Sequence, residues 1–559
     1  MRIQPLIALV VLSLATVPGA RTAIREFKAR TLGLLILACL LVAAPATAQV
    51  NYAVSGSTAY VTSSPNASGA IVIASTYNGY PVTSTGDYAF SGCTNLTSVS
   101  IPNSVTNMGD YAFNNCSGLT SVTIPNGVPT IGFRAFFRCS SLTSVTIPNS
   151  VTSIRNEAFR FCSGLTNVII GNGVTVIWEW AFQTCTSLTS VTIPNSVTEI
   201  WTGAFQSCSS LTNVTIGNSV TLIRSSAFFG TSLTSVSIPS SVVGIATDAF
   251  YRSISLTNFS VDAANPVYSS LNGVLFNKAQ TALIIFPPGR GGSYVIPDSV
   301  TSIGNWAFYD CTSVTNVIIG NGVALIGDQA FYGCANLASV TMGNSVTNIG
   351  SAAFSGCTNL TSVTIPNSVT SIGYTAFYRC TSLTSVTIGN SVTSIGGSAF
   401  SYCTSLTRLT IPNSVTILGD SAFLNCSNLT NFTFLGNRPG LAPNFEVGGY
   451  YQFYGVGAGA KVYYYCGTTG WGATYGGSAP LPTVMLCPPQ IAPGSAGMKP
   501  GGFGFTLTFL TNQTIVVEAS TNLPNWQPIW TNSPPGTSTN FVDPDWLNHS
   551  NRFYRARSD

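Results

Sequence analysis

A 23-residue repeat dominates the sequence. Ala-Phe pairs recur at that spacing, with the phenylalanine at 90, 113, 136, 159, 182, 205 and 228, then at 250 and, after a longer gap, at 308, 331, 354, 377, 400 and 423. The shared unit is A-F-x-x-C-x-x-L-T-x-V-T-I-P-N-S-V-T-x-I-G-x-x. Regular repetition at this length is typical of a solenoid, in which each unit forms one coil and neighbouring coils share a core.

The positions of the unit suit a coil of this kind. In one regular copy Leu360, Val363 and Ile365 have the L-x-x-L-x-L spacing of a leucine-rich repeat strand. Pro366 has no N–H and ends that strand, and Gly373 permits a tight bend. A single unit cannot bury its own apolar positions, so we expect stacked coils with one continuous interior.

With these motifs the chain resembles the BspA-like leucine-rich repeat proteins, whose 23-residue units carry the pattern A-F-x-x-C-x-x-L-x-x-V-x-I-P. The resemblance covers about residues 52–434 in some fourteen copies. It implies a curved solenoid with a parallel β-sheet, β-rich here and of the α/β class by family. It also implies a secreted or surface-displayed bacterial protein, commonly an adhesin, whose repeat carries no catalytic residues.

Changes in pattern divide the chain into successive segments. Asn272-Gly273, flanked by alternating apolar residues, predicts a β-hairpin inserted in the solenoid. Alternation at Phe503, Phe505 and Leu507 predicts a small β-sandwich-like module. The expected segments are a leader at 1–48, a capping hairpin at 49–86, the solenoid at 87–434 with its insertion at about 262–293, an atypical closing segment at 435–490, a linker at 491–502 and the C-terminal module at 503–559.

The leader at 1–48 has the features of a secretory signal. Apolar runs at 6–17 and 32–44 each follow basic residues, and the second ends in Ala46-Thr47-Ala48. We expect cleavage after Ala48 and export to the cell surface or the medium, with either run serving as the signal. Beyond Ala48 no apolar run is long enough to cross a bilayer, so no membrane span is expected in the mature chain.

Charge and motifs argue against several classes of function. Only 7% of the chain is charged, and residues after 48 hold 16 basic and 16 acidic side chains, so nucleic-acid binding by bulk charge is not expected. His549 is the sole histidine, which argues against histidine-based metal or catalytic sites. The serine-hydrolase and phosphate-loop motifs are absent, and Asp543 and Asp545 are too few for calcium. We therefore expect no enzymatic activity, no cofactor and no metal.

Twelve of the 15 cysteines stand three residues after a repeat phenylalanine. Side chains stacked in a ladder point the same way and fit disulfide geometry poorly, so we expect a buried column of free thiols that pack as small hydrophobic groups. Cys466 and Cys487 lie outside the repeats, and we predict a disulfide between them.

Variation between copies concentrates around the Ala-Phe pair, where aromatic residues and arginine gather. This is the composition of protein-binding hot spots, although neutral drift on a solvated edge would also allow it. The candidate binding residues are Phe137, Arg138, Arg160, Phe161, Trp178, Trp180, Trp201, Tyr251, Arg252, Trp306, Tyr378 and Arg379. A weak basic patch, diluted by Glu157, is formed by Arg134, Arg138, Arg155 and Arg160.

The outward positions of the repeat strand are almost always threonine or serine. Thr361, Ser362 and Thr364 in one copy correspond to Thr97, Ser98 and Ser100 in another. Threonine suits an exposed strand, which alone would explain the pattern. A face of repeated hydroxyls could also bind a polysaccharide by multivalent contacts or order water in an ice-like array.

Together these patterns predict a non-enzymatic, secreted or surface-displayed scaffold that binds an extracellular protein over an extended surface. The alternatives are polysaccharide binding through the Thr/Ser face and a structural spacer that displays the C-terminal module. The partner is an extracellular protein or glycan, and the chain is expected to be a monomer.

Overall fold

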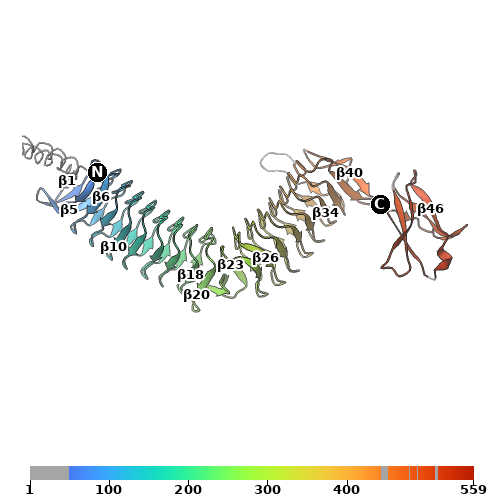
Figure 1. Ribbon diagram of the computed structural model, residues 1–559, viewed down its shortest axis with the longest axis horizontal. Helices are drawn as coiled ribbons and strands as arrows, with labels where there is room; N and C mark the ends of the chain where they lie inside the picture. The colour runs from blue at the N-terminus through green and yellow to red at the C-terminus, as the bar shows by residue number, and fades with distance from the viewer. Residues whose placement is uncertain are drawn as a thin grey trace, which may run out of the picture.

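The computed structural model describes residues 50–441, 451–477, 479–486, 489–509, 514–549 and 551–558. These residues form no α-helix; apart from the 3-10 turn η1 (Trp546–Asn548), their regular structure is all β. Figure 1 shows two solenoid arms that meet at an angle near β20 (Asn258–Val261) and β23 (Ala282–Ile285), with a small module beyond the second arm. The predicted β-rich leucine-rich repeat solenoid is confirmed.

Each coil carries one strand on its L-x-x-V-x-I segment, and these strands stack in parallel. The register equals one repeat, so that Val145 lies opposite Val168 and Val363 opposite Val386. In the first arm the strands are β3 (Gly69–Val72), β6 (Leu96–Ser100), β8 (Ser121–Thr123), β10 (Ser144–Ile147), β12 (Asn167–Ile170), β14 (Ser190–Thr192), β16 (Asn213–Thr215), β18 (Ser235–Ile238) and β20. In the second arm they are β24 (Gly292–Val295), β26 (Val314–Ile318), β28 (Ser339–Thr341), β30 (Ser362–Thr364), β32 (Ser385–Thr387), β34 (Arg408–Ile411), β36 (Asn431–Phe434), β38 (Lys461–Tyr465) and β40 (Leu481–Leu486), beside which β39 (Thr474–Tyr475) runs antiparallel.

A second ladder of two-residue strands follows the V-T-x-I segment of each coil. In the first arm it consists of β7 (Asn107–Met108), β9 (Thr130–Ile131), β11 (Ser153–Ile154), β13 (Val176–Ile177), β15 (Glu199–Ile200), β17 (Leu222–Ile223) and β19 (Gly244–Ile245). In the second arm it consists of β25 (Ser302–Ile303), β27 (Leu325–Ile326), β29 (Asn348–Ile349), β31 (Ser371–Ile372), β33 (Ser394–Ile395), β35 (Ile417–Leu418) and β37 (Gly440–Leu441).

Antiparallel strands cover the N-terminal end of the solenoid. The strands β1 (Tyr52–Ser55) and β2 (Thr58–Val61) form a hairpin, and β2 joins the parallel ladder through β5 (Tyr80–Thr85). The short β4 (Thr76–Tyr77) pairs with β5, which in turn pairs with β7. An antiparallel hairpin at this end covers the backbone groups that the first coil would otherwise leave unpaired.

The core is a column of stacked phenylalanine rings. Phe113 and Phe136 have ring centroids 5.2 Å apart and planes 2° apart, and Phe354 and Phe377 repeat this arrangement at 5.3 Å and 4°. Every repeat phenylalanine is fully buried, as are the alanines that precede the rings. The stacked rings therefore form a continuous core that is shared by successive coils, as the repeat predicts.

The twelve repeat cysteines are free and buried, which confirms the predicted thiol column. The structure adds a hydrogen bond: Cys357 donates its Sγ–H to the carbonyl of Phe331 in the preceding coil, at 3.2 Å. Where cysteine is missing, a hydroxyl takes its place. Ser253 donates to the carbonyl of Phe228 in the preceding coil at 2.9 Å, as the cysteines do, whereas Thr231 donates to the same carbonyl within its own coil at 3.0 Å. The column therefore satisfies a buried backbone acceptor as well as filling space.

The arms meet at an insertion that interrupts both ladders. The strands β21 (Tyr268–Leu271) and β22 (Val274–Asn277) pair antiparallel, and β23 then pairs parallel with β25. The inserted coil supplies Phe286, whose ring stacks on Phe308 at 4.5 Å. Phe286 stands three residues after Leu283. In the next coil Phe308 stands five residues after Ile303, which is the register partner of Leu283. The inserted coil therefore has a shorter turn than the repeats, and Figure 1 shows the insertion at the vertex where the arms meet.

Two small antiparallel sheets form the C-terminal module. One contains β41 (Gln490–Ile491), β43 (Gly502–Thr508), β42 (Gly497–Lys499) and β46 (Ser538–Asp543), and the other β45 (Gln527–Asn532), β44 (Ile515–Ser520) and β47 (Phe553–Ser558). Phe505, Leu507 and Val517 pack between them. This is the predicted β-sandwich-like module.

Two predictions fall on residues outside the described ranges. The leader at 1–48 is one of them. Cys487 is the other: Cys466 is exposed, and its predicted disulfide stays a prediction that mass spectrometry without reduction tests. No helix in the described part of the chain has the length and apolarity needed to cross a bilayer.

Candidate functional site

The variable side chains lie on one turn of each coil, which we call the A-F turn: the residues from three before to two after each repeat phenylalanine. The positions two before and two after the ring adopt left-handed backbone conformations. In the coil of Phe136 they are Arg134, with φ of 52°, and Arg138, with φ of 60°. Glycine holds the second position in other coils, as Gly333 and Gly356. A side chain costs roughly 1–2 kcal/mol in this conformation, so large side chains here are held at an energetic cost.

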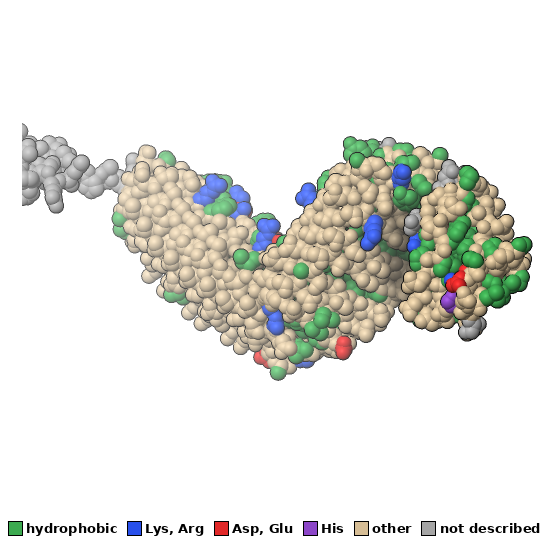
Figure 2. Space-filling model, turned by 45° about the vertical axis from the view of Figure 1, so that its right-hand side comes forward, with side chains coloured by type: hydrophobic (Ala, Val, Ile, Leu, Met, Phe, Trp, Pro, Cys, Tyr) green, Lys and Arg blue, Asp and Glu red, His purple; other side chains and the backbone are tan. Residues whose placement is uncertain are grey.

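In the first arm, five of the predicted residues come together in adjacent A-F turns: Phe137, Arg138, Arg160, Phe161 and Trp180. The ring of Phe137 meets that of Phe161 edge-on at 5.5 Å, and the Arg138 guanidinium carbon lies 5.3 and 5.5 Å from their centroids. Arg160 lies 4.7 Å from the Phe161 ring and 6.0 Å from that of Trp180. Figure 2 shows basic and hydrophobic side chains gathered on the side of this arm that faces into the bend.

Glu157 anchors this cluster from beneath. It is 5% exposed and accepts hydrogen bonds from Arg134 at 2.8 Å and Arg160 at 2.7 Å. Burial by itself raises the pKa of Glu157, but the two guanidinium groups outweigh burial and hold the pKa below its usual value. The carboxylate thus neutralises part of the predicted basic patch and fixes two of its arginines.

Trp178 and Trp201 belong to a different column, four residues before the repeat phenylalanine. Their rings lie 4.7 Å apart, and Arg224 covers Trp201 at 4.1 Å from its centroid. The indole N–H of Trp178 donates to the hydroxyl of Ser153 at 2.9 Å. Trp178 also lines a shallow groove of about 580 Å³ together with Arg155. The structure therefore separates these two tryptophans from Trp180, with which the sequence grouped them.

At the bend, Tyr251 and Trp306 lie together although the whole insertion separates them in the sequence. Their rings meet edge-on at 6.0 Å, and Tyr251 also stacks on Tyr309 at 4.4 Å. Arg252 forms an ion pair with Asp310 across the same junction at 3.2 Å. Tyr251 is buried, so it joins the two arms and is not an exposed anchor.

In the second arm, Tyr378 and Arg379 form a cluster with Tyr402 from the next coil. The two tyrosine rings meet edge-on at 5.5 Å, and the Arg379 guanidinium carbon lies 5.3 and 5.5 Å from their centroids. Arg379 itself is exposed. This cluster has the same composition as the one around Arg138.

Several contributing side chains were missed by reading one coil at a time. These are Tyr111, Phe133, Tyr309, Tyr332, Tyr402 and Asp310. All except Phe133 stand at the same offsets from a repeat phenylalanine as the predicted residues, so alignment of the coils on that ring would have found them. Their contacts are between coils, and in the regular repeat such partners lie about one repeat unit apart in the sequence.

The threonine column of the strand face has an internal role. Thr120 donates its hydroxyl to the backbone carbonyl of Thr97 at 2.9 Å, and Thr384 donates to that of Thr361 at 3.0 Å. A second column does the same after each Pro-Asn-Ser-Val turn, where Thr175 donates to the carbonyl of Thr152 at 3.1 Å. Because these hydroxyl donors pair with the preceding coil, near-constant threonine is explained by coil stacking.

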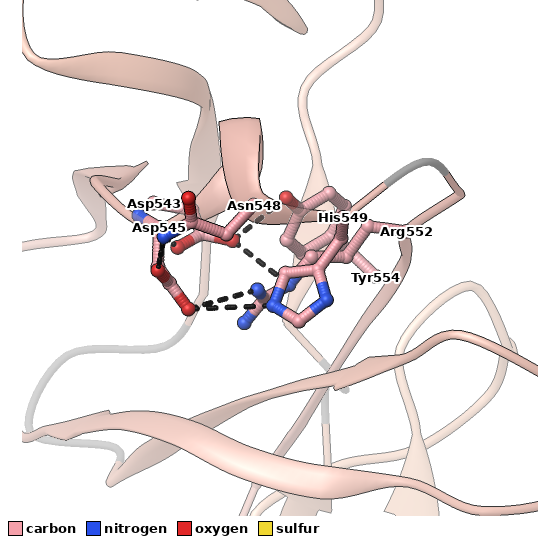
Figure 3. Close-up of polar contacts among 6 residues, drawn as sticks. All are labelled: Asp543, Asp545, Asn548, His549, Arg552 and Tyr554. Atoms are coloured by element: carbon pink, nitrogen blue, oxygen red, sulfur yellow. Dashed lines mark hydrogen bonds and ion pairs between the residues drawn. The ribbon is translucent and has the colours of Figure 1, made fainter.

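The two aspartates of the C-terminal module bind side chains of the same module, as Figure 3 shows. Asp543 accepts from the Tyr554 hydroxyl at 2.8 Å and pairs with Arg552 at 3.0 Å. Asp545 lies 3.3 Å from His549 and also contacts Asn548. Arg552 also lies 3.5 Å from Asp545, and a guanidinium group beside both carboxylates opposes metal binding. Within the described ranges, no group of three or more potential metal ligands was found.

Stacked parallel coils with variable side chains gathered in and beside one turn define a repeat-scaffold protein. The family model described as "BspA type Leucine rich repeat region (6 copies)" matches residues 77–187, 130–257, 175–287, 292–373 and 353–441, which together exceed half of the chain. The chain belongs to this BspA-type leucine-rich repeat family.

Solved structures of bacterial proteins are similar to this chain. A leucine-rich cell surface protein of Faecalibacterium prausnitzii A2-165 is 32% identical with a TM-score of 0.50, over 70% of this chain and 96% of that chain. A leucine-rich repeat protein of Bacteroides ovatus ATCC 8483 is 25% identical with a TM-score of 0.46, over 74% and 98%. The pneumococcal vaccine antigen PcpA is 20% identical with a TM-score of 0.48, over 75% and 92%. A search of curated proteins found no match.

Proposed function

We propose that this chain is a non-enzymatic scaffold, secreted or displayed on the cell surface, whose A-F turns bind an extracellular protein. One observation carries the proposal: aromatic residues and arginine occupy left-handed positions where glycine would be less strained. Phe161 has φ of 63°, Trp180 of 55° and Arg379 of 58°. The fold imposes this conformation on other coils as well, with Ala352 and Ser207, so what distinguishes these turns is the large side chains that they hold.

The chemistry of the A-F turns suits protein recognition. Arginine and large aromatic residues dominate binding hot spots because they bury much area at a small loss of conformational freedom. Here the rings of Phe137 and Phe161 are half-buried, and Arg160 is held by Glu157. The surface is therefore ordered before a partner arrives, which lowers the entropic cost of binding.

The alternatives receive less support from the structure. Polysaccharide binding by the Thr/Ser face was suggested by constant threonines, but the hydroxyls of its first column already donate to carbonyls of the preceding coil, as Thr384 does to Thr361. A plain spacer would not need Trp180 or Phe161 at these positions, since glycine, alanine and serine occur in equivalent places. Display at the cell surface is supported by the similarity to the Faecalibacterium prausnitzii cell surface protein.

The test is an array of purified extracellular proteins beside an array of glycans, probed with the full secreted chain and two variants. The turn variant carries Phe161→Gly and Trp180→Gly, which remove aromatic rings where the backbone favours glycine. The face variant carries Thr361→Ser and Ser362→Ala on the exposed strand face. We expect protein ligands that the turn variant loses and the face variant keeps. Protein binding unchanged in the turn variant, or glycan binding lost only in the face variant, would contradict the proposal.

A further inference from the structure

We infer that Arg138 and Arg379 form two equivalent sites, one on each arm, that bind carboxylate side chains of an acidic segment in a partner protein. The inference rests on the proposed protein-binding function and specifies the chemistry of the partner.

The two sites have the same construction although they lie on opposite sides of the bend. In each, the arginine stands two residues after a repeat phenylalanine, with φ of 60° at Arg138 and 58° at Arg379. One ring comes from the residue before the arginine and the other from the next coil, where Phe161 and Tyr402 hold the same place. In both sites the guanidinium carbon lies 5.3 Å from the first ring and 5.5 Å from the second.

Neither arginine has an acidic partner among the described residues. The other arginines of the A-F turns do: Arg134 and Arg160 share Glu157, and Arg252 pairs with Asp310. Arg138 and Arg379 are exposed. Among the described residues, their guanidinium groups contact aromatic rings alone. The N–H donors of a guanidinium group lie in its own plane. A guanidinium group held between aromatic rings therefore keeps these donors available for an incoming carboxylate.

The third copy of the motif shows which group fits. Tyr251-Arg252 repeats the aromatic-arginine pair at the bend, but the next regular coil there presents Asp310 at the place of Phe161 and Tyr402. The Asp310 carboxylate lies 3.2 Å from Arg252 Nε. This copy is thus closed by a carboxylate of the chain itself, and the two open copies lack that group.

An acidic protein segment is favoured over an acidic glycan. The group that closes the third copy is an amino-acid side chain, and Phe137 and Phe161 offer apolar ring edges for the methylene groups of aspartate or glutamate. Two such sites on separate arms suit a long partner that touches both, because a second contact gains from the first.

The test uses fluorescence anisotropy of a labelled peptide of alternating glutamate and serine, titrated with the full chain at low ionic strength. We expect two peptides bound per chain. Arg138→Gly and Arg379→Gly should each remove one, and the double variant should weaken binding by at least about tenfold. Glycine suits the left-handed backbone at both positions, so the variants are expected to fold. Ser207→Gly, at the same turn position with φ of 59°, is the matched control.

A gain of binding gives the sharper test. Asp310→Gly should open the third site and raise the stoichiometry by one peptide, and glycine already stands at this position as Gly333 in the next coil. Peptide binding unchanged in the double variant overturns the inference, as does preference for polygalacturonate over the peptide. If the protein array still shows binding that the Phe161→Gly, Trp180→Gly variant loses, the proposed function survives that failure.

Discussion

Tyr251 and Tyr309 stack with their ring centroids 4.4 Å apart and their planes 3° apart, although the whole insertion lies between them in the sequence. They belong to the last turn of the first arm and the first regular turn of the second. The inserted coil between them has a shorter turn, so the two rings meet directly over it. One side of the solenoid is thereby shortened, and the arms bend toward the A-F turns.

This contact predicts that the angle between the arms depends on Tyr309. Tyr309→Ala removes the stack that joins the arms, and an aromatic pair contributes about 0.5–1.5 kcal/mol. We expect a broader distribution of interatomic distances in small-angle X-ray scattering. Tyr332→Ala is the control, because Tyr332 stacks on Tyr309 at 5.0 Å within the second arm. Equal scattering changes in both variants would contradict a specific role at the bend.

The ring column predicts a large effect of removing one ring. Phe354 is fully buried between Phe331 and Phe377. Phe354→Ala should lower the free energy of unfolding by about 3–5 kcal/mol because it leaves a cavity between coils. Thermal and urea unfolding followed by circular dichroism measure this. Ser362→Ala, exposed in the same coil, should change little, and an unaltered melting temperature for the Phe354 variant would refute the assignment.

The thiol column predicts a loss of stability at high pH. Burial raises the pKa of Cys116, Cys380 and Cys426 to about 12, above the ordinary value of 9.0. The unfolded chain therefore loses thiol protons first, so stability is intact below pH 9.0 and falls as the pH rises toward about 12. Urea unfolding at a series of pH values measures the slope. Cys380→Ser should reduce this slope because a serine hydroxyl does not ionise in this pH range, and serine can keep the hydrogen bond that Ser253 makes.

The left-handed turn positions predict stabilisation by glycine. Ala352 has φ of 53° in the coil of Phe354. Ala352→Gly should raise the free energy of unfolding by up to about 1 kcal/mol, because relief of the strained backbone exceeds the entropy lost by glycine. Ala353→Gly is the control: this alanine is buried next to the ring and is not left-handed, so the change should destabilise. Destabilisation in both variants would contradict the backbone strain inferred at Ala352.

The anchor beneath the first-arm cluster predicts an acid-sensitive contribution to stability. The pKa of Glu157 lies below its usual 4.5, because hydrogen bonds from Arg134 and Arg160 outweigh burial. Its contribution is therefore present above pH 4.5 and is lost as the pH falls through the lowered value. Glu157→Gln should cost about 1–3 kcal/mol at neutral pH and flatten the acid dependence of unfolding. Glu179→Gln, in the next coil, controls for loss of a negative charge.

Sequence periodicity was enough to predict the coil, its parallel stacking and its core. The spacing of Phe354, Cys357 and Leu360 recurs in each regular copy, and only stacked coils bury those positions together. Free buried thiols followed from the same reasoning, because a ladder does not bring two sulfurs into disulfide geometry.

The tertiary structure alone decided which side chains act together. Arg138 meets Phe161, and Tyr251 meets Tyr309, because stacking brings together residues of different coils. Backbone geometry also decides the left-handed conformation of Trp180, the hydrogen bond that the Thr384 hydroxyl donates and the ion pair between Arg252 and Asp310. Periodicity shows which positions are apolar, but contacts between coils depend on the direction in which each backbone turn aims its side chain.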